Sequence, residues 1–363
     1  MVDRCCDASL SIAMIASSRH PIAQPFAGGL EAHVWHLTRA LVEAGHRVTL
    51  FAGPGSDTEL RTALLNTVPF EPSARARADI SMPPTTVLRE HHAYLSLMLD
   101  LIDDPDAFDI VHNHSLHHLP IAMAPALRIP MLTTLHTPPT PWLESALSIT
   151  PDTACVAVSD HTAQSWEPIT GPVPVIGNGI RHENWPLGAG GDEWVWFGRM
   201  VPEKGAHLAI AAARRAGRRL RLAGPISDHD YYTTRVAPQL DDDIRYVGHL
   251  DQDQLARLVG SCAVALITPV WDEPYGLVVA ESMMCGTPVA AFARGGIPEI
   301  VGDAGILVAS DDPDALAAGA CAAEHLDRAA VRAHAMRNCS ESAMVERYQR
   351  RYLDLMGRPV MAS

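Results

Sequence analysis

The chain has almost no lysine and is short of positive charge. Of the 28 basic residues among its 363 residues, Lys204 alone is a lysine, and 42 acidic residues bring the formal net charge to −14. So acidic a chain lacks the basic face on which non-specific nucleic-acid binding depends, and we expect no nucleic-acid partner. Because 47% of the residues are hydrophobic and only 19% charged, the composition also excludes a disordered or fibrous protein.

Long hydrophobic runs are absent as well. The longest strongly apolar stretch, residues 258–270, is interrupted by Gly260, Ser261 and Thr268, so it is too short to span a bilayer. Charged residues near the start of the chain leave no continuous apolar segment of the kind a secretory signal needs. The 7 cysteines are scattered and odd in number, which favours a reducing compartment over a disulfide framework. We therefore expect a cytoplasmic protein with no strong membrane signal.

Apolar blocks alternate with amphipathic segments along both halves of the chain. This length suits two domains of roughly 150–180 residues each, and a cluster of Glu-Pro, Gly-Pro and Val-Pro steps at 167–176 predicts the boundary. Strand-then-helix alternation indicates parallel sheets covered by helices on both faces, with a ligand cleft at the carboxyl ends of the strands. Residues 53–95 and 137–150, rich in proline, are predicted to be irregular loops that shape this cleft. Strands are expected at 10–16, 47–52, from 110, and at 130–136, 194–197, 220–223, 244–247, 263–267, 289–292 and 305–308; helices are expected after Gly29 and at 206–216, 252–259, 277–284 and 342–356.

The segment from Glu273 to Glu281 carries two carboxylates around a predicted helix start. Pro274 disfavours helix at Glu273, and Gly276 opens the helix that contains Glu281. The free amides of Tyr275, Gly276 and Leu277 lie between the two carboxylates, and such a helix N-terminus suits anionic or hydroxyl-rich ligands. Each carboxylate can accept hydrogen bonds from a vicinal diol. The alternative is ordinary electrostatics, because acidic residues favour the first turn of a helix.

Two cations follow the first predicted strand of the second half. Arg199 and Lys204 lie between this strand and the next helix, at the edge where a diphosphate can be held. A guanidinium fork and a mobile ammonium complement each other in binding a diphosphate. In the first half, Gly28 and Gly29 precede a helix, where glycine lets backbone amides approach a phosphate closely. The alternatives are solvated surface charges for the cations and an ordinary tight turn for the glycines.

A run of histidines, His112, His114, His117 and His118, invites interpretation as a metal site. The first two alternate at a strand end, and the last two point elsewhere if a loop or helix follows. Zinc requires ligands that converge tetrahedrally, usually with cysteines or carboxylates, and no cysteine is near in the sequence. We therefore predict no metal here, and assign these residues to the cleft wall and to a helix start.

Taken in order, these motifs resemble the retaining glycosyltransferases of family 4, which have the GT-B fold of two Rossmann-like α/β domains. The resemblance runs over nearly the whole chain. It rests on Gly28-Gly29, Phe108 to His112, Thr134-Leu-His136-Thr137, Ala157-Val-Ser159, Asn178-Gly179, Gly198-Arg199, Lys204-Gly205, Gly248, the segment Glu273 to Glu281, Gly286 to Val289 and Gly295-Gly296-Ile-Pro-Glu299. It implies an N-terminal acceptor domain at 1–168, a C-terminal donor domain at 169–340, and a helix at 341–363 that crosses back to the first domain.

The resemblance also implies a role for each residue of the site. Glu281 is expected to bind the ribose diol of a nucleotide diphosphate sugar. Glu273 and the amides of Tyr275, Gly276 and Leu277 are expected to hold the transferred sugar. The diphosphate is expected between Arg199, Lys204 and the amides of Gly28 and Gly29, with Gly248 also on the donor side. His136 is expected beside the transferred sugar, and Thr137 toward the acceptor.

Three departures from the family pattern bear on the choice of substrates. The common Asn-Gly-Val-Asp run ends here in Arg181, so the aspartate contribution is absent or altered. Tyr275 replaces the usual phenylalanine and is expected to place a hydroxyl near the donor sugar. Trp271 and Asp272 precede Glu273, where small residues are frequent.

We therefore expect a metal-independent enzyme without a cofactor. It moves a hexosyl group from a nucleotide diphosphate sugar, with a UDP-sugar favoured, to an acceptor hydroxyl with retention. The preorganised cations match the charge that develops on the departing diphosphate. Two alternatives stay open: a sugar-nucleotide epimerase of the same fold, and a non-catalytic sugar-nucleotide-binding protein.

Overall fold

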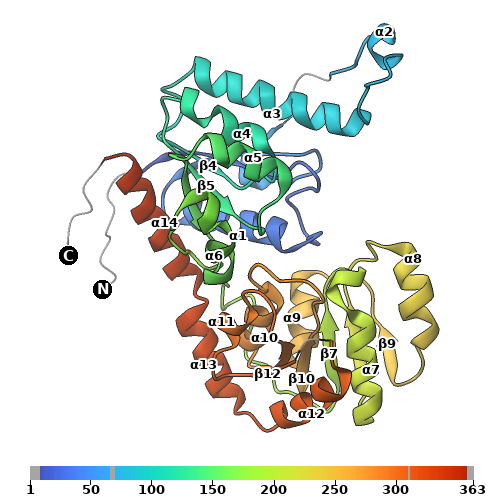
Figure 1. Cartoon of the computed structure of the whole chain (residues 1–363). Coiled ribbons are helices and arrows are strands. Elements are labelled where there is room, and N and C mark those ends of the chain that lie inside the picture. The colour runs from blue at the N-terminus through green and yellow to red at the C-terminus, as the bar shows by residue number, and fades with distance from the viewer. Residues whose placement is uncertain (1–8, 66–69, 310, 358–363) are drawn as a thin grey trace.

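The computed structural model describes residues 9–65, 70–309 and 311–357. It contains two six-stranded parallel sheets, one in each half of the chain (Figure 1). The first sheet has the order β3-β2-β1-β4-β5-β6, and the second has the order β12-β11-β10-β7-β8-β9. The predicted two-domain Rossmann-like α/β fold is confirmed. The strands are β1 (Ser11–Ile15), β2 (Arg47–Ala52), β3 (Thr62–Leu64), β4 (Ile110–Asn113), β5 (Met131–Leu135), β6 (Ala154–Ala157), β7 (Trp194–Phe197), β8 (Leu220–Ala223), β9 (Ile244–Tyr246), β10 (Val264–Ile267), β11 (Val289–Phe292) and β12 (Ile306–Val308).

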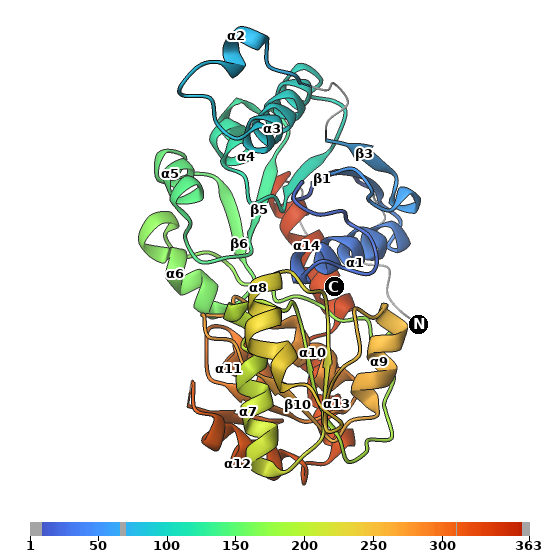
Figure 2. The ribbon, with the colours of Figure 1, turned by 90° about the vertical axis from the view of Figure 1, so that its right-hand side faces the viewer.

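Helices cover both faces of each sheet (Figures 1 and 2). None of the helices in the described ranges is both long and apolar enough to cross a membrane. The α-helices of the described residues are α1 (Gly29–Glu43), α2 (Ala74–Arg77), α3 (Thr85–Asp103), α4 (His118–Met123), α5 (Pro141–Ile149), α6 (Asp160–Thr170), α7 (Ala206–Ala216), α8 (His229–Tyr231), α9 (Gln252–Gly260), α10 (Leu277–Met284), α11 (Ile297–Val301), α12 (Pro313–Ala323), α13 (Arg328–Asn338) and α14 (Glu341–Leu355).

The central strands are buried on both faces, as continuous apolar blocks predict for parallel sheets. In β1, Ile12 and Met14 join the core on one side of the sheet, while Ala13 and Ile15 join the core on the other. The second sheet repeats the arrangement, because the tryptophans of β7 pack into one core while Val195 and Phe197 pack into the other. Alternation of side chains along a strand thus divides each half into two apolar layers around one sheet.

The two segments predicted to be irregular are partly helical, and here the prediction was wrong. Residues 137–150 contain α5, which begins at Pro141 after Thr140. Residues 53–95 contain β3, α2 and the first half of α3. Proline misled the interpretation, because proline is favoured in the first turn of a helix as well as in loops.

Two segments that connect the halves run side by side. Ile180 pairs with Ser340 in an isolated parallel bridge, and the Ile180 amide donates to the Cys339 carbonyl at 2.8 Å. A Cβ on Gly179 would lie 2.5 Å from the Cα of Glu341, so only glycine allows this approach. Beyond the bridge, α14 returns to the first sheet, where Tyr348 and Tyr352 are fully buried (Figure 1). The domain boundaries given above stay a prediction.

Candidate active site

A cleft of about 410 Å³ lies between the two halves, at the carboxyl ends of both sheets. Its wall combines residues after β1, β4 and β5 of the first half with residues after β7, β8 and β10 of the second. Eleven of the residues singled out from the sequence line it: Gly28, Gly29, His136, Thr137, Arg199, Lys204, Glu273, Tyr275, Gly276, Leu277 and Glu281. Gly248 is not among the lining residues, although His249 and Leu250 are. The carbonyl of Gly248 instead accepts a hydrogen bond from the Gly224 amide at 2.9 Å.

Glu273 is held in place by its own backbone. The Gly296 amide donates to the Glu273 carbonyl at 2.8 Å, and a Cβ on Gly295 would lie only 2.1 Å from that same oxygen. Gly276, at the N-cap of α10, has a φ of 102°, a left-handed conformation that favours glycine. These two glycine turns keep Glu273 outside the helix while Leu277 already begins it, as the sequence predicted.

The carboxylate of Glu273 is paired with the one lysine of the chain. Lys204 Nζ lies 2.5 Å from Glu273 Oε2, and the Trp271 indole donates to the same oxygen at 3.1 Å. The side chains of Lys204 and Glu273 are only 23% and 15% exposed, so solvent screens this pair less than a surface pair. The sequence placed the two residues in one site but did not show this contact.

Arg199 reaches across the cleft toward the glycine loop of the first half. Its Nε lies 4.0 Å from the position that a Cβ on Gly28 would occupy, and its nearest described carboxylate, Glu203, is 3.9 Å away. Gly29 lies against Leu277, because a Cβ there would approach the leucine Cδ1 to 3.0 Å. The structure therefore brings the glycine loop, Arg199 and the start of α10 together, and backbone amides, a weakly paired guanidinium and the Glu31 carboxylate border one space.

Glu281 lies on α10 at the wall of the cleft, away from the cations of the site. No residue in the described part of the chain forms a hydrogen bond or an ion pair with its carboxylate. Burial therefore dominates, and it raises the pKa of the Glu281 carboxyl to about 8. A half-buried carboxyl without donors is suited to a ligand that brings hydroxyl donors of its own.

The hydroxyl of the tyrosine in this segment is held by a backbone carbonyl of the connection between the halves. The Tyr275 hydroxyl donates to the carbonyl of Asn178 at 2.7 Å, and the ring is 7% exposed beside Gly177. Burial raises the pKa of this phenol well above its usual range. Tyr275 and Asn178 both line the cleft, and the expectation that the hydroxyl lies near a donor sugar stays a prediction.

His136 ends a chain of hydrogen-bonded imidazoles that the sequence did not reveal. Its Nε2 lies 2.8 Å from His114 Nδ1, and His114 Nε2 lies 3.1 Å from His112 Nδ1. His112 in turn contacts the Thr134 hydroxyl at 2.8 Å and the Tyr352 hydroxyl of α14 at 2.6 Å. Burial holds the pKa of all three imidazoles well below the usual value, so they are neutral at pH 7. The C-terminal helix thus supports the orientation of a cleft histidine.

The histidine run separates into two groups. His114 joins His33 of α1 and His136 in a buried group, in which one ring nitrogen of each residue lies within 4.8 Å of the others. His117 and His118 join His91 of α3 in a second, half-buried group of the same compactness. Within the second group, His117 caps α4 by accepting from the Leu119 amide at 3.2 Å, as the expectation of helix-start polarity proposed.

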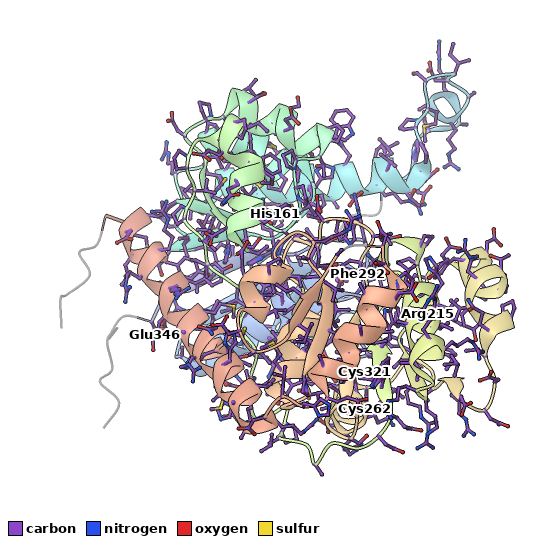
Figure 3. The ribbon with its side chains drawn as sticks, turned by 60° about the horizontal axis from the view of Figure 1, so that its bottom comes forward. His161, Arg215, Cys262, Phe292, Cys321 and Glu346 are labelled. Atoms are coloured by element: carbon purple, nitrogen blue, oxygen red, sulfur yellow. The ribbon has the colours of Figure 1, made fainter. Side chains whose placement is uncertain are left out.

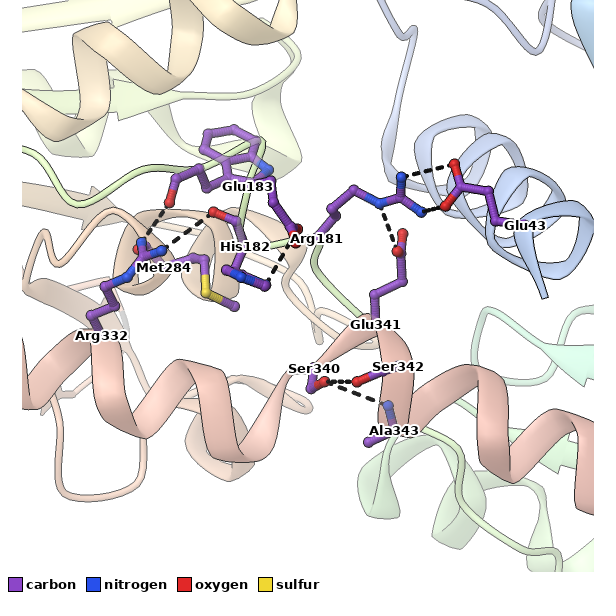
Figure 4. Close-up of polar contacts among 11 residues, drawn as sticks. Glu43, Arg181, His182, Glu183, Met284, Arg332, Ser340, Glu341, Ser342 and Ala343 are labelled. Carbon is purple, nitrogen blue, oxygen red and sulfur yellow. Dashed lines mark hydrogen bonds and ion pairs between the residues drawn. The ribbon is translucent and has the colours of Figure 1, made fainter. Parts of the chain in front are cut away.

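Arg181, the departure from the family pattern, joins the connection to the first half (Figure 4). Its two terminal nitrogens donate to both carboxylate oxygens of Glu43 on α1 at 3.0 and 2.6 Å, and its Nε donates to Glu341 on α14 at 2.7 Å. The two carboxylates hold the pKa of this guanidinium above its usual range. A second tie crosses the halves at His161 (Figure 3), whose amide donates to Glu299 of α11 at 2.8 Å.

Comparison with known proteins agrees with this geometry. Residues 27–184 match the model of "Glycosyltransferase Family 4", and residues 191–323 match that of "Glycosyl transferases group 1". The chain belongs to the group 1 glycosyltransferases. The two matches together take in the second sheet, every strand of the first sheet except β1, and the eleven cleft residues named above.

Curated relatives and a solved structure extend the likeness over most of the glycosyltransferase chain. It is 29% identical to a glycogen synthase of Mycobacterium tuberculosis over 336 residues, covering 80% of this chain and 81% of that protein. It is 28% identical to a D-inositol 3-phosphate glycosyltransferase of Frankia alni over 354 residues, covering 81% and 86%. The Anabaena protein HepE, solved in complex with UDP-glucose, shares the fold with a TM-score of 0.73 at 16% identity, covering 95% of this chain and all of that one.

Proposed function

We propose that this glycosyltransferase moves a hexosyl group from a nucleotide diphosphate sugar to an acceptor hydroxyl, with retention at the anomeric carbon. Arg199 facing the loop of Gly28 and Gly29 across the cleft carries the proposal, because this space offers positive charge and backbone amides to a diphosphate. UDP-sugar is the favoured donor, since HepE of the same fold is described with UDP-glucose. Glu281 accepts from the ribose diol, and Glu273 accepts from hydroxyls of the sugar.

The proposed reaction needs no protein nucleophile. The acceptor oxygen attacks the anomeric carbon on the face that the diphosphate leaves, and the departing phosphate oxygen takes the acceptor proton. Arg199 and Lys204 stabilise the charge that develops on the diphosphate, so this step asks for no metal ion. His136 and Thr137 lie on the opposite wall, where they position the sugar and the acceptor. Closure of the halves excludes water from the reacting centre.

The test is to incubate the purified chain with UDP-, GDP- and ADP-sugars and to measure release of the nucleotide diphosphate. Thermal-shift measurements with the same panel identify the base first. We expect a UDP-sugar to raise the melting temperature most and to be turned over slowly even without an added acceptor. Anomeric configuration in a transferred product, read by NMR, decides retention. Stabilisation by no nucleotide sugar in the panel contradicts the proposal.

The same experiment separates the two other functions left open by the sequence. An epimerase interconverts sugar nucleotides without releasing the diphosphate. A non-catalytic sugar-nucleotide-binding protein is stabilised by its ligand and converts nothing. The pairing of Lys204 with Glu273 in the cleft supports the transferase, which places a cation at the leaving group and a carboxylate at the transferred sugar.

A further inference from the structure

The buried histidine group behind the cleft brings together three elements of the first half. His33 comes from α1, His114 follows β4, and His136 follows β5. The His33 ring centroid lies 5.3 Å from that of His114 and 5.2 Å from that of His136. One nitrogen of each residue lies within 4.8 Å of the others, and His33 and His114 are 3% and 0% exposed. Three imidazoles from distant parts of the sequence therefore converge on one point.

His33 is the residue that the glycosyltransferase site does not explain. Neither of its ring nitrogens has a hydrogen-bond partner among the described residues, although the side chain is almost completely buried. A buried polar atom without a partner destabilises the fold, so such an atom calls for a ligand. One of these unpartnered nitrogens lies within 4.8 Å of a ring nitrogen of each of the two other imidazoles.

The chemistry of the three ligands selects the ion. Neutral imidazole suits zinc, copper and nickel, whereas magnesium and calcium prefer oxygen ligands. Zinc binds imidazole nitrogen at about 2.0–2.1 Å, which in a tetrahedral site separates neighbouring nitrogens by about 3.3 Å. The His114 Nδ1 to His136 Nε2 distance of 2.8 Å has to open by about half an ångström, which a small ring rotation allows.

A second shell for such an ion is already built. His114 Nε2, the nitrogen that faces away from His136, contacts His112, which is fixed by Thr134 and Tyr352. A partner on the second ring nitrogen orients a metal-binding histidine and sets its tautomer. His114 is thereby held with Nδ1 toward the group.

We propose that His33, His114 and His136 bind one divalent transition-metal ion of the zinc type, and that the bound ion inhibits the enzyme by occupying Nε2 of His136, whose ring lines the cleft. Three protein ligands leave the fourth position of a tetrahedral ion free for water. The inhibition rests on the proposed function, whereas the binding does not. The sequence argued against a metal in this region because only the run from His112 to His118 was visible, and two of the three proposed ligands lie outside that run.

Cobalt tests the binding directly, since Co²⁺ replaces zinc and absorbs visible light strongly in a tetrahedral site. The full chain, first treated with a chelator, is titrated with Co²⁺ and then with competing Zn²⁺. We expect one equivalent of Co²⁺ to produce the tetrahedral spectrum and Zn²⁺ to abolish it. His33→Phe, which keeps a planar ring, is expected to lose the spectrum. His118→Ala, the matched control, disrupts the second histidine group and is expected to keep the tetrahedral spectrum.

Several outcomes overturn the site. They are a wild-type chain that gives no tetrahedral spectrum, a spectrum that survives in His33→Phe, and a spectrum that disappears in His118→Ala alone. Thermal unfolding checks that each variant is folded, and His33→Gln replaces His33→Phe if the larger ring is not accommodated. Either variant is expected to lose the spectrum while keeping a cooperative transition.

Turnover gives the second measurement. With UDP-glucose as donor, Zn²⁺ is expected to inhibit nucleotide release by the wild type and by His118→Ala, but not by His33→Phe, whose activity without metal is unchanged. Equal inhibition of all three proteins contradicts the inhibitory role. A wild type that turns over no nucleotide sugar refutes the proposed function instead, and the cobalt spectra still decide the metal site.

Discussion

The raised pKa of Glu281 makes donor binding depend on pH in a direction that can be stated in advance. A carboxyl with a pKa near 8 is largely protonated at pH 6 and largely ionised at pH 9. Under the proposed function, the ribose diol donates a hydrogen bond to this group, and the ionised form accepts it better. Affinity for UDP-glucose is therefore expected to increase as the pH rises through the pKa.

The magnitude follows from the same pKa. If the protonated form bound no donor, affinity would rise by about 100-fold between pH 6 and 9. The protonated carboxyl still forms a neutral hydrogen bond, and a charge-assisted hydrogen bond contributes about 1.4 kcal/mol more binding free energy than a neutral one. That difference corresponds to about a tenfold rise, equivalent to lowering the pKa of Glu281 from about 8 to about 7 on binding. About half a proton is then released per donor bound near pH 7.5.

Calorimetric titration with UDP-glucose in two buffers of different ionisation enthalpy measures both quantities. UDP-glucose is preferred to UDP because its diphosphate does not titrate in this range. The matched control is Glu281→Gln, which resembles the protonated side chain. It is expected to bind like the wild type at pH 6, to show no rise toward pH 9 and to release no proton. A flat wild-type profile, or an equal slope in the glutamine variant, refutes the reasoning.

Three further predictions concern the cleft and the connection between the halves. Lys204→Ala and Glu273→Ala are each expected to lower turnover by about two to three orders of magnitude in the nucleotide-release assay, and near-wild-type transfer by either contradicts the site. Gly295→Ala forces a Cβ to 2.1 Å from the Glu273 carbonyl, so it is expected to unfold at lower temperature than Gly217→Ala, which is equally left-handed but has no atom within 4 Å. Arg181→Ala leaves its partner on α14 part-buried without a cation and is expected to lower stability by about 1–3 kcal/mol in denaturant titration; an unchanged midpoint shows that the ion pairs contribute nothing.

The parts of the fold that the sequence predicted share one property. β7, α7, β8, α10 and β11 have the bounds expected from their apolar blocks, because each is a continuous or periodic run with a glycine or a proline beside it. α5 was missed since three prolines precede or begin it, and the first half of α3 since it lies in a segment interpreted as a loop. Local pattern was enough where the chain alternates strand and helix closely, and failed where a helix starts in a proline-rich stretch.

The candidate site likewise has features that the sequence predicted and features that it did not. Motif order placed all but Gly248 of the chosen residues on one cleft, because parallel strands end at the same edge of a sheet. The sequence did not predict which of those residues contact one another. His33 and His136 are far apart in the sequence, and no periodicity relates α1 to the end of β5. The hydrogen bond from the Tyr275 hydroxyl to the Asn178 carbonyl is a further contact that the motif did not predict.

The pairing of Lys204 with Glu273 changes what the two residues are expected to do. Considered separately, Lys204 is expected to neutralise a diphosphate, and Glu273 is expected to accept hydrogen bonds from a sugar. Without a donor, the two side chains neutralise each other in a chain of net charge −14. A diphosphate brings two negative charges to Lys204, so it competes for the ammonium with a single carboxylate. Under the proposed function, Glu273 is then expected to turn toward the sugar hydroxyls while the Trp271 indole still holds one of its oxygens. The proposed function therefore predicts that donor binding and the readiness of the sugar-binding carboxylate are coupled through this ion pair.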